Sequence, residues 1–316
     1  MSEKEKLDAA YGGPGWEPRP RSLREELGDL WAPCGQSREW DPLRAVLLHP
    51  PGPELERVPD PGAALMLGRP DPDRARRQHR ALEEAYHSAG VEVHRVDPPE
   101  GVQVTPNLMY CADLFFMTPE GAILARPAGL ARAGEERWVQ RRLADLGVPI
   151  LRAVGGRGTF EGADAMWLDP GTALLAQGLR TNRDGADQVT AVLDAMGVEV
   201  IRVSLPRGTM HLMGQLRIVD RDLAFFWPGR FPEPGPSALA ERGYRLVPAP
   251  DEDEARRGFA LNFVVLEPRE VLMHQGCPIS QATYEEMGVT CHTVEMDEIT
   301  RAAGGIGCLT GIVRRG

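Results

Sequence analysis

The sequence predicts an α/β fold built from five copies of one unit, in which a β-hairpin is followed by a helix and then by another strand. Five segments share a pattern in which a short turn of Pro, Gly or charged residues separates two apolar runs. Each is followed by a segment of helical character and then by a third apolar run. A unit with one helix cannot cover both faces of its sheet, so five consecutive units are expected to form a ring with shared cores. The predicted fold is therefore a five-bladed ββαβ propeller with pseudo-fivefold symmetry.

Four of the five segments have the two apolar runs of a β-hairpin. These hairpins are expected in residues 113–125, 164–176, 216–227 and 262–274. The first segment, residues 44–54, has one clear strand and no partner strand nearby. The C-terminal stretch CLTGIVRR can supply the missing strand, which would place both ends of the chain in one sheet.

Each predicted helix ends at a glycine. The helices are expected in residues 73–88, 135–146 and 184–196, with shorter ones in SALAERG and QATYEEMG. The glycines that follow them are Gly90, Gly147, Gly197, Gly243 and Gly288. Glycine adopts the left-handed conformation that ends a helix without steric cost. The third strand of each unit begins directly after this glycine, for example as VEVHRVD or VEVIRVSLP.

The composition excludes several classes of protein. The formal net charge of −10 leaves no basic field for nucleic acid or for anionic lipid. No apolar run approaches the roughly 18 residues of a membrane span. The cysteines have no regular spacing, which argues against a disulfide framework or a zinc site, so the expected location is the reducing cytoplasm.

The N-terminal stretch MSEKEKLDAAYGGPGWEPRPRS is polar and rich in Pro and Gly, unlike a signal peptide. We expect residues 1–39 to form a flexible lead-in and residues 40–316 to form a single catalytic domain. The sequence leaves open whether the chain assembles into a homo-oligomer.

Reactive side chains occur at equivalent places in the repeats. Asp113, Glu161, Asp164 and His211 lie at or just before the start of a hairpin, and Cys308 precedes the closing strand. Equivalent positions in a ring of repeats converge near its axis, so we expect these side chains to face one cavity. Each has a plain structural alternative, which is a buried apolar role for the cysteine, a packing role for the histidine and turn formation for the carboxylates.

The glycines around Cys308, in GGIGCLTG, would allow a substrate to approach the sulfur. A thiol, a histidine and carboxylates form a set of nucleophile, acid–base group and orienting group. Of Glu161 and Asp164, one would orient His211 and the other would contact the substrate. Carboxylates beside a thiol disfavour an anionic electrophile and favour a guanidinium, which donates its N–H groups in a planar fork. These residues therefore indicate a small guanidino substrate.

Several motifs resemble those of the guanidino-group-modifying superfamily, which comprises arginine deiminases, dimethylarginine dimethylaminohydrolases, arginine dihydrolases and amidinotransferases. FEGAD resembles the E/D-G-G-D element of this superfamily, MHL its histidine-containing strand start, and GGIGCLTG its terminal cysteine loop. YCAD resembles the F-x-R/E-D element. The likeness covers nearly the whole chain after Trp40, and the superfamily fold, the α/β propeller called a pentein, agrees with the repeats.

The resemblance implies roles for individual residues. Cys308 would be the nucleophile, and His211, oriented by Glu161, would be the acid–base group. The Cys308 thiolate would attack the guanidinium carbon while His211 protonates the departing amine, which leaves an amidino-thioether on the cysteine. His211 would then deprotonate water or an acceptor amine, and no metal or organic cofactor is needed.

The resemblance also implies a set of substrate contacts. Asp113 and Asp164 would bind the guanidinium. Arg132, in ARPAGLARAGEE, and Arg180, in LRTNRDGADQV, match arginines that bind the substrate carboxylate in the dimethylargininases. Asn107 is either a turn residue or a further substrate contact.

One departure from the superfamily pattern bears on the reaction. Deiminases and many amidinotransferases carry His-x-Asp, whereas this chain has Met213 at the position of that aspartate. Our leading hypothesis is a hydrolase that acts on the guanidinium group of arginine or a close derivative and releases ammonia or an amine. The alternative is an amidinotransferase that moves the amidino group to an amine acceptor, and REWDPLRAVLL near the N-terminus is similar to that branch.

Overall fold

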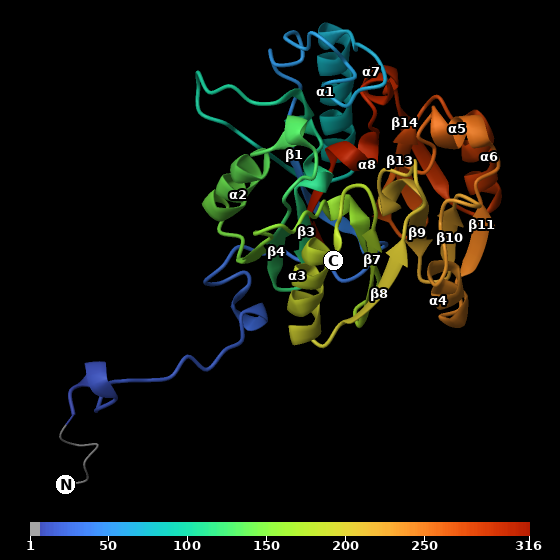
Figure 1. Cartoon of the computed structure of the whole chain (residues 1–316). Helices are drawn as coiled ribbons and strands as arrows, with labels where there is room; N and C mark the ends of the chain where they lie inside the picture. The colour runs from blue at the N-terminus through green and yellow to red at the C-terminus, as the bar shows by residue number, and fades with distance from the viewer. Residues whose placement is uncertain (1–6) are drawn as a thin grey trace.

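The computed structural model describes residues 7–316 and contains five sheets of three strands each (Figure 1). In every sheet the middle strand pairs antiparallel with one neighbour and parallel with the other. The sheets are β15 (Gly311–Arg315), β1 (Leu43–Leu48), β2 (Glu92–Arg95); β3 (Phe115–Thr118), β4 (Gly121–Leu124), β5 (Ile150–Ala153); β6 (Ala165–Asp169), β7 (Thr172–Gln177), β8 (Glu199–Ser204); β9 (Leu216–Asp220), β10 (Leu223–Phe226), β11 (Arg245–Pro248); and β12 (Val264–Glu267), β13 (Glu270–His274), β14 (Thr290–Val294). The predicted α/β fold with five hairpin-based units is confirmed.

The first sheet joins the two ends of the chain. Its antiparallel pair consists of β1 and β15, with Val46 opposite Ile312 and Leu47 opposite Gly311. The other four antiparallel pairs are hairpins of consecutive strands. The C-terminal stretch therefore supplies the partner that the first repeat lacks, as the sequence predicts.

A helix follows each of the four hairpins, and another follows β1, whose antiparallel partner β15 lies at the end of the chain. These helices are α1 (Pro72–Ser88), α2 (Glu136–Asp145), α3 (Arg183–Ala195), α4 (Gly235–Glu241) and α6 (Pro278–Glu286). The Asp71 side chain accepts a hydrogen bond from the Arg74 N–H at the start of α1, and Asn182 does the same for Gly185 at the start of α3. All five glycines that follow these helices have φ between 72° and 82°, the left-handed conformation expected of a helix stop.

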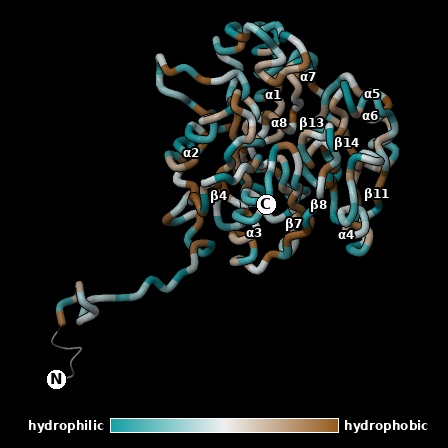
Figure 2. The backbone as a smooth tube through the Cα atoms, in the orientation of Figure 1, coloured by the Kyte–Doolittle hydropathy of each residue, from teal (hydrophilic) through white to brown (hydrophobic). Residues whose placement is uncertain are grey.

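The hydrophobic core consists of five clusters, each shared by two sheets. Successive residues of an inner strand point to opposite faces, so Phe115 joins the cluster between the first and second sheets and Phe116 joins the one between the second and third. The fifth sheet shares its second cluster with the first, where Val264 and Val46 meet. Because both faces of the inner strands are covered, they are continuous apolar runs, and hydrophobic and hydrophilic stretches follow one another along the chain (Figure 2).

Additional short helices, which the sequence did not indicate, complete the described part of the chain. They are α5 (Glu252–Arg256), α7 (Asp297–Arg301), α8 (Ile306–Leu309) and the 3₁₀ turns Ala9–Tyr11, Arg24–Glu26, Pro106–Met109, Cys111–Asp113, Leu130–Arg132, Gly162–Asp164 and Leu212–Gly214. None of the helices in residues 7–316 has the length and hydropathy needed to cross a membrane.

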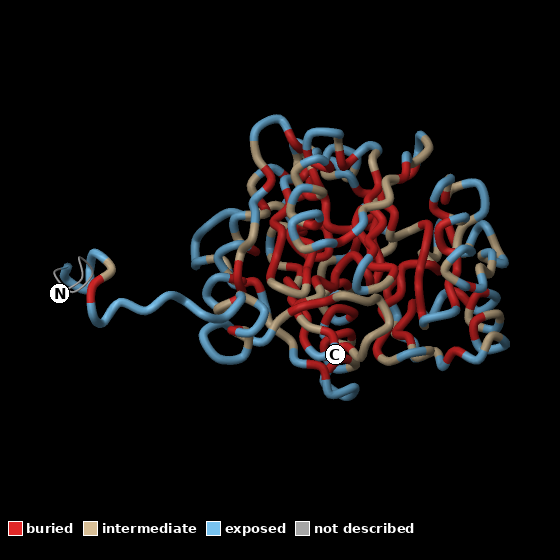
Figure 3. Tube along the Cα trace, turned by 90° about the horizontal axis from the view of Figure 1, so that it is seen from below, coloured by how far each residue is buried: buried red, intermediate tan, exposed pale blue. Residues whose placement is uncertain are grey.

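The N-terminal segment extends away from the body of the protein and is mostly exposed up to about residue 25 (Figures 1 and 3). It joins the body before residue 40, because the Ala32 N–H donates to the Gly147 carbonyl and the Gly35 N–H to the Val313 carbonyl. Residues 1–6 of the expected lead-in lie outside the described part. The division into a lead-in and one catalytic domain stays a prediction.

A substitution at Gly162 can test the close contact between the second and third repeats. A Cβ at this position would lie 2.1 Å from the Phe115 carbonyl oxygen and 2.5 Å from that of Ala112. Gly162→Ala should therefore lower the free energy of unfolding by about 1–3 kcal/mol or more, measured by urea denaturation. Gly155→Ala is the matched control, because nothing lies within 4 Å of its Cβ. Equal losses in the two variants would contradict the close approach.

Candidate active site

Short helical turns carry the reactive side chains into the centre of the protein. Asp113 ends the turn Cys111–Asp113, while Glu161 and His211 directly precede the turns Gly162–Asp164 and Leu212–Gly214. Cys308 lies within α8. Each turn leads into an antiparallel strand of its sheet, so each of these side chains lies a few residues before the start of such a strand.

His211 is held between two carboxylates. Its Nε2 lies 2.7 Å from Glu161 Oε2, and its Nδ1 lies 3.7 Å from Asp113 Oδ1. Burial lowers the pKa of His211, but Asp113, Glu161 and Asp164 outweigh this effect and raise the pKa to about 9. Burial likewise raises the pKa of Glu161, but the hydrogen bond and charge of His211, with Arg132 and Arg180, lower it to about 2. At neutral pH the pair is therefore an imidazolium and a carboxylate.

The Cys308 thiol is buried, and Asn262 fixes its position. Asn262 Nδ2 lies 3.0 Å from Cys308 Sγ, and Asn262 Oδ1 accepts the Cys308 N–H at 3.0 Å. Burial, together with the charge of Asp113, raises the thiol pKa to about 11, against the lowering effects of the Asn262 hydrogen bond and the Arg217 charge. The thiol of the free protein is therefore protonated at neutral pH.

Asn262 is a positioning residue that our sequence reasoning missed. It is the first residue of the fourth predicted hairpin, and it occupies the place before β12 that Asp113 occupies before β3. The repeat was thus the signal that could have found it. The role of Asn262 is harder to predict from sequence than that of a charged side chain, because it depends on a contact with Cys308, 46 residues further along the chain.

A small cleft connects the thiol with the predicted substrate contacts. Asn107, Asp113, Arg132, Arg180 and Cys308 line it, and its volume is about 20 Å³. Asp113 Oδ1 and Asn107 Oδ1 are buried and accept no hydrogen bond from residues 7–316. Two orphaned acceptors in a buried cleft suit a ligand that brings its own N–H donors.

The two predicted carboxylate-binding arginines differ in their surroundings. Arg132 donates to Asp113 and, at 2.8 Å, to Glu135, and it lies 3.5 Å from Glu161. Burial lowers the pKa of Arg132, but these carboxylates outweigh it, so the pKa is raised. Among residues 7–316, Arg180 bonds to Glu161 alone, whose Oε2 and Oε1 lie 3.1 Å and 3.3 Å from its Nη1. Arg180 therefore keeps more N–H groups for a ligand than Arg132.

Glu135 is a second residue that our sequence reasoning missed. It is buried, it binds Arg132, and it accepts a hydrogen bond from the Thr105 hydroxyl. Burial raises its pKa to about 7 despite the neighbouring Arg132. Sequence offered no signal for it, because a glutamate beside a predicted helix start is common on protein surfaces.

Asp164 does not line the cleft, contrary to the expectation that it contacts the substrate. Its Oδ2 accepts the Thr181 hydroxyl at 2.7 Å, and its Oδ1 accepts the Leu212 N–H at 3.1 Å. Burial raises its pKa to about 6. Because its hydrogen bonds hold the turn that follows His211, it supports the histidine from behind the cleft wall.

The carboxylates and the histidine could also hold a metal ion by geometry alone. Ligand atoms of Asp113, Glu161 and His211 lie within 4.8 Å of one another. Arg132 already binds Asp113 and lies beside Glu161, so a metal ion would have to displace a guanidinium. Asp113, Glu161 and His211 therefore suit an organic cation better than a metal ion.

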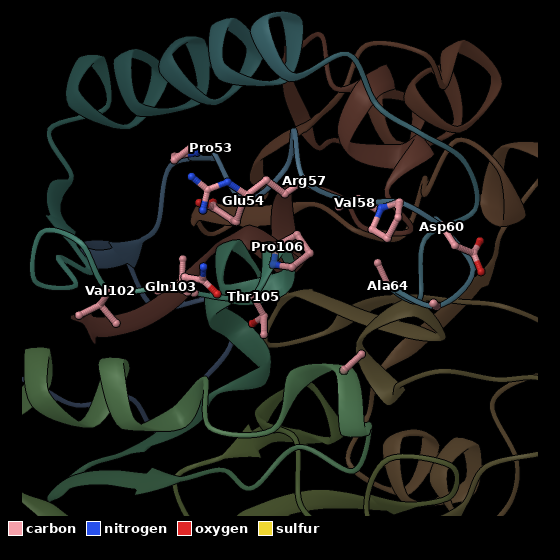
Figure 4. Close-up of a pocket in the computed structure, with 14 residues that line it drawn as sticks. Pro53, Glu54, Arg57, Val58, Asp60, Ala64, Val102, Gln103, Thr105 and Pro106 are labelled. Atoms are coloured by element: carbon pink, nitrogen blue, oxygen red, sulfur yellow. The ribbon is translucent and has the colours of Figure 1, made fainter.

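Two larger cavities lie near the cleft. One, of about 310 Å³, reaches Cys308 and His211 and is lined in part by Met213, Trp227 and Phe259. The other, of about 350 Å³, lies between residues 53–64 and 102–106 (Figure 4). Neither Cys308 nor His211 lines the second one, so it is separate from the reactive groups.

Comparisons with known proteins agree with the fold. No family model matches the chain. The N(G),N(G)-dimethylarginine dimethylaminohydrolase of Pseudomonas aeruginosa is 24% identical over 244 residues, which are 77% of this chain and 90% of that protein. SxtG, an amidinotransferase from Microseira wollei, has a TM-score of 0.72 at 17% identity, over 90% of this chain and 98% of its own. The N-terminal domain of ArgZ, a cyanobacterial arginine dihydrolase, has a TM-score of 0.71 at 21% identity, over 85% and 97%.

The Asn262 contact predicts the reactivity of Cys308. A hydrogen bond to a charged group contributes about 1.5–3 kcal/mol, so Asn262→Ala should raise the thiol pKa by about one to two units. At pH 8–9, iodoacetamide should therefore alkylate Cys308 at least about tenfold more slowly, as followed by mass spectrometry. Asn107→Ala is the control, because Asn107 lines the cleft without bonding to the sulfur. Unchanged alkylation in Asn262→Ala would contradict the assigned role.

Proposed function

We propose that this chain, which belongs to the superfamily of guanidino-group-modifying enzymes, hydrolyses the guanidinium group of arginine or a close derivative through a covalent intermediate on Cys308. The observation that carries the proposal is the pair of orphaned oxygens, Asp113 Oδ1 and Asn107 Oδ1, in a buried cleft that ends at the Cys308 sulfur. A guanidinium can donate to both oxygens while its carbon faces the thiol.

The first half of the reaction forms the covalent intermediate. The substrate cation beside Cys308 stabilises the thiolate, whose proton leaves to solvent. The sulfur bonds to the guanidinium carbon, and the bond from that carbon to the departing nitrogen breaks. His211, protonated at neutral pH, gives its proton to the leaving amine, and Glu161 then holds the neutral ring in place.

The second half consumes water. Neutral His211 takes a proton from water, whose oxygen bonds to the carbon while the sulfur–carbon bond breaks. The product is a ureido compound, which is citrulline when the substrate is arginine, and His211 ends protonated again. Asp113 retains its charge throughout and favours the cationic substrate over the neutral product.

Substrate binding must enlarge the cleft, because a volume of about 20 Å³ is too small for a guanidinium. Leu65, with φ 61°, and Ala303, with φ 71°, line the cleft in left-handed conformations that non-glycine residues seldom adopt. We propose that the loop carrying Leu65 moves when the substrate enters.

An amidinotransferase is the second candidate, and a specific observation favours it. The cavity of about 310 Å³ that reaches Cys308 and His211 offers room for an acceptor amine in place of water. The deciding experiment is an assay of products from arginine with and without added amines. Citrulline and ammonia without an acceptor support the hydrolase, and a new substituted guanidine that requires the acceptor supports transfer. Absence of turnover with every guanidine would overturn both.

Cys308→Ser should abolish turnover while leaving the fold intact, because a hydroxyl at this position is a far weaker nucleophile than a thiolate. A rapidly quenched reaction of the unmodified protein should show an adduct on Cys308 and on none of Cys34, Cys111, Cys277 and Cys291, measured by peptide mass spectrometry. Substantial turnover by the serine variant would rule out the covalent route.

Arg180 should recognise the carboxylate of the substrate. Arg180→Gln should lower kcat/KM for arginine by a factor that corresponds to about 2–5 kcal/mol of transition-state stabilisation. This is the usual cost of removing one partner of a buried charge pair. Agmatine, which has no carboxylate, is the control substrate, and its kcat/KM should fall much less. Equal losses for the two substrates would mean that Arg180 acts only through its contact with Glu161.

A further inference from the structure

We infer that the cavity of about 310 Å³ beside Cys308, which we term the amine chamber, binds the amine that leaves or attacks the guanidine carbon, and that this amine has an apolar body and a carboxylate at its far end. The inference rests on the proposed function. It names the chemistry of a substrate part that the cleft with Asp113 and Arg180 does not accommodate.

The position of the amine chamber makes it a second approach to the same sulfur. Cys308 lines both the chamber and the small cleft, whereas Asp113 and Arg180 line only the cleft and His211 lines only the chamber. A guanidine carbon bonded to Sγ therefore faces both spaces. The nitrogen next to His211, which exchanges a proton with it, points into the chamber.

The charges around the amine chamber differ from those of the cleft. No Asp or Glu from the described residues 7–316 lines the chamber, and Met213 stands where the His-x-Asp pattern has a carboxylate. Arg230 and Arg256 line it instead. A positive surrounding lowers the pKa of a bound amine, so it favours the neutral amine that can act as a nucleophile and disfavours a bound ammonium.

Two buried acceptors in the amine chamber have no partner. Gln215 Oε1 and Thr209 Oγ1 line the chamber and form no hydrogen bond with residues 7–316. Both side chains are more than nine-tenths buried. Gln215 is oriented by its Nε2, which donates to the His211 carbonyl at 3.3 Å. These oxygens can accept the N–H groups of an amine beside His211.

The walls and mouth of the amine chamber define the rest of the ligand. Met210, Met213, Trp227 and Phe259 provide apolar surface. Phe259 has φ 55°, and its carbonyl accepts the Asn262 N–H at 2.7 Å, so one turn holds both the wall and the residue that fixes the thiol.

Arg230 supplies the anion-binding end. It lies over the Trp227 ring at 5.4 Å and donates to the Gly208 carbonyl at 3.1 Å. It forms no ion pair within the part of the chain that the structure describes, unlike Arg256, which pairs with Glu252. An arginine anchored by a carbonyl and a ring but lacking a carboxylate partner is suited to bind one from a ligand.

The chemical step balances in both directions. For an Nω-substituted arginine, the sulfur–carbon bond forms, the carbon–nitrogen bond to the substituent breaks, and the amine leaves with the proton from His211. In the reverse direction a free amine attacks the thioether carbon, its proton passes to His211, and the thiolate departs. The same chamber thus serves an amine released from a substrate or one supplied as an acceptor.

The experiment compares three amines of increasing fit: methylamine, butylamine and 4-aminobutyrate. In one arm each is the Nω-substituent of arginine, and citrulline is measured. In the other arm each is added to arginine, and the substituted guanidine is measured by mass spectrometry. We expect kcat/KM for 4-aminobutyrate to exceed that for butylamine at least tenfold in one of the two arms. The arm that shows this preference also tells whether the chamber takes an amine released from the substrate or one supplied as an acceptor. Equal values for butylamine and 4-aminobutyrate in both arms would overturn the inference.

Variants separate this inference from the proposed function. Arg230→Gln should remove the preference for 4-aminobutyrate and leave butylamine unchanged, whereas Arg207→Gln, an exposed arginine outside the chamber, should change neither. Phe259→Ala should reduce the use of both longer amines at least fivefold relative to methylamine. If unsubstituted arginine forms the Cys308 adduct but these variants retain the preferences, only the inference fails. If no adduct forms from any guanidine, the proposed function fails.

Discussion

The pairing of β15 with β1 is the constraint on which the rest of the structure depends. It brings the last strand beside the first, so the fifth sheet shares a hydrophobic cluster with the first. Further contacts secure this junction: Tyr86 and Thr310 hydroxyls lie 2.7 Å apart, and Arg315 donates to the carbonyls of Asp41 and Val265. Because Cys308 lies just before β15, the junction also determines the position of the proposed nucleophile.

The arrangement of the candidate site also depends on the buried charges near Cys308. The buried Glu161 contacts three cationic groups, His211, Arg132 and Arg180, and Asp113 shares in balancing the charges of Arg132 and His211. Buried ions are tolerated when each has a partner of opposite charge and well-formed hydrogen bonds. The proposed acid–base pair of His211 and Glu161 is therefore already in contact in the free protein, whereas the proposed mechanism needs a substrate cation to ionise the thiol.

In the proposed reaction, water and amines would compete for the same carbon, and the two cavities at Cys308 bear on that competition. The cleft is lined by carboxylate and amide oxygens together with arginines, whereas the amine chamber is apolar with arginines and unpaired acceptors. Under the proposed function, the cleft binds the guanidinium and the amine chamber binds the amine, so the side chains that differ between them act on different parts of one reaction. Met213 contributes directly to this division by leaving the chamber without a carboxylate.

The sequence alone determined the repeat, the helix stops at glycine and the positions of Asp113, Glu161, His211 and Cys308 within the units. Hydrophobic periodicity and turn chemistry are properties of neighbouring residues, so they can be recognised without a structure. Only the tertiary structure decided that Asp164 supports His211 from behind, that Asn262 holds the thiol and that Arg132 is bound by carboxylates. Each of these depends on which side chains from distant repeats come within hydrogen-bonding distance, because a polar side chain acquires its role from the partner that satisfies it when water is excluded.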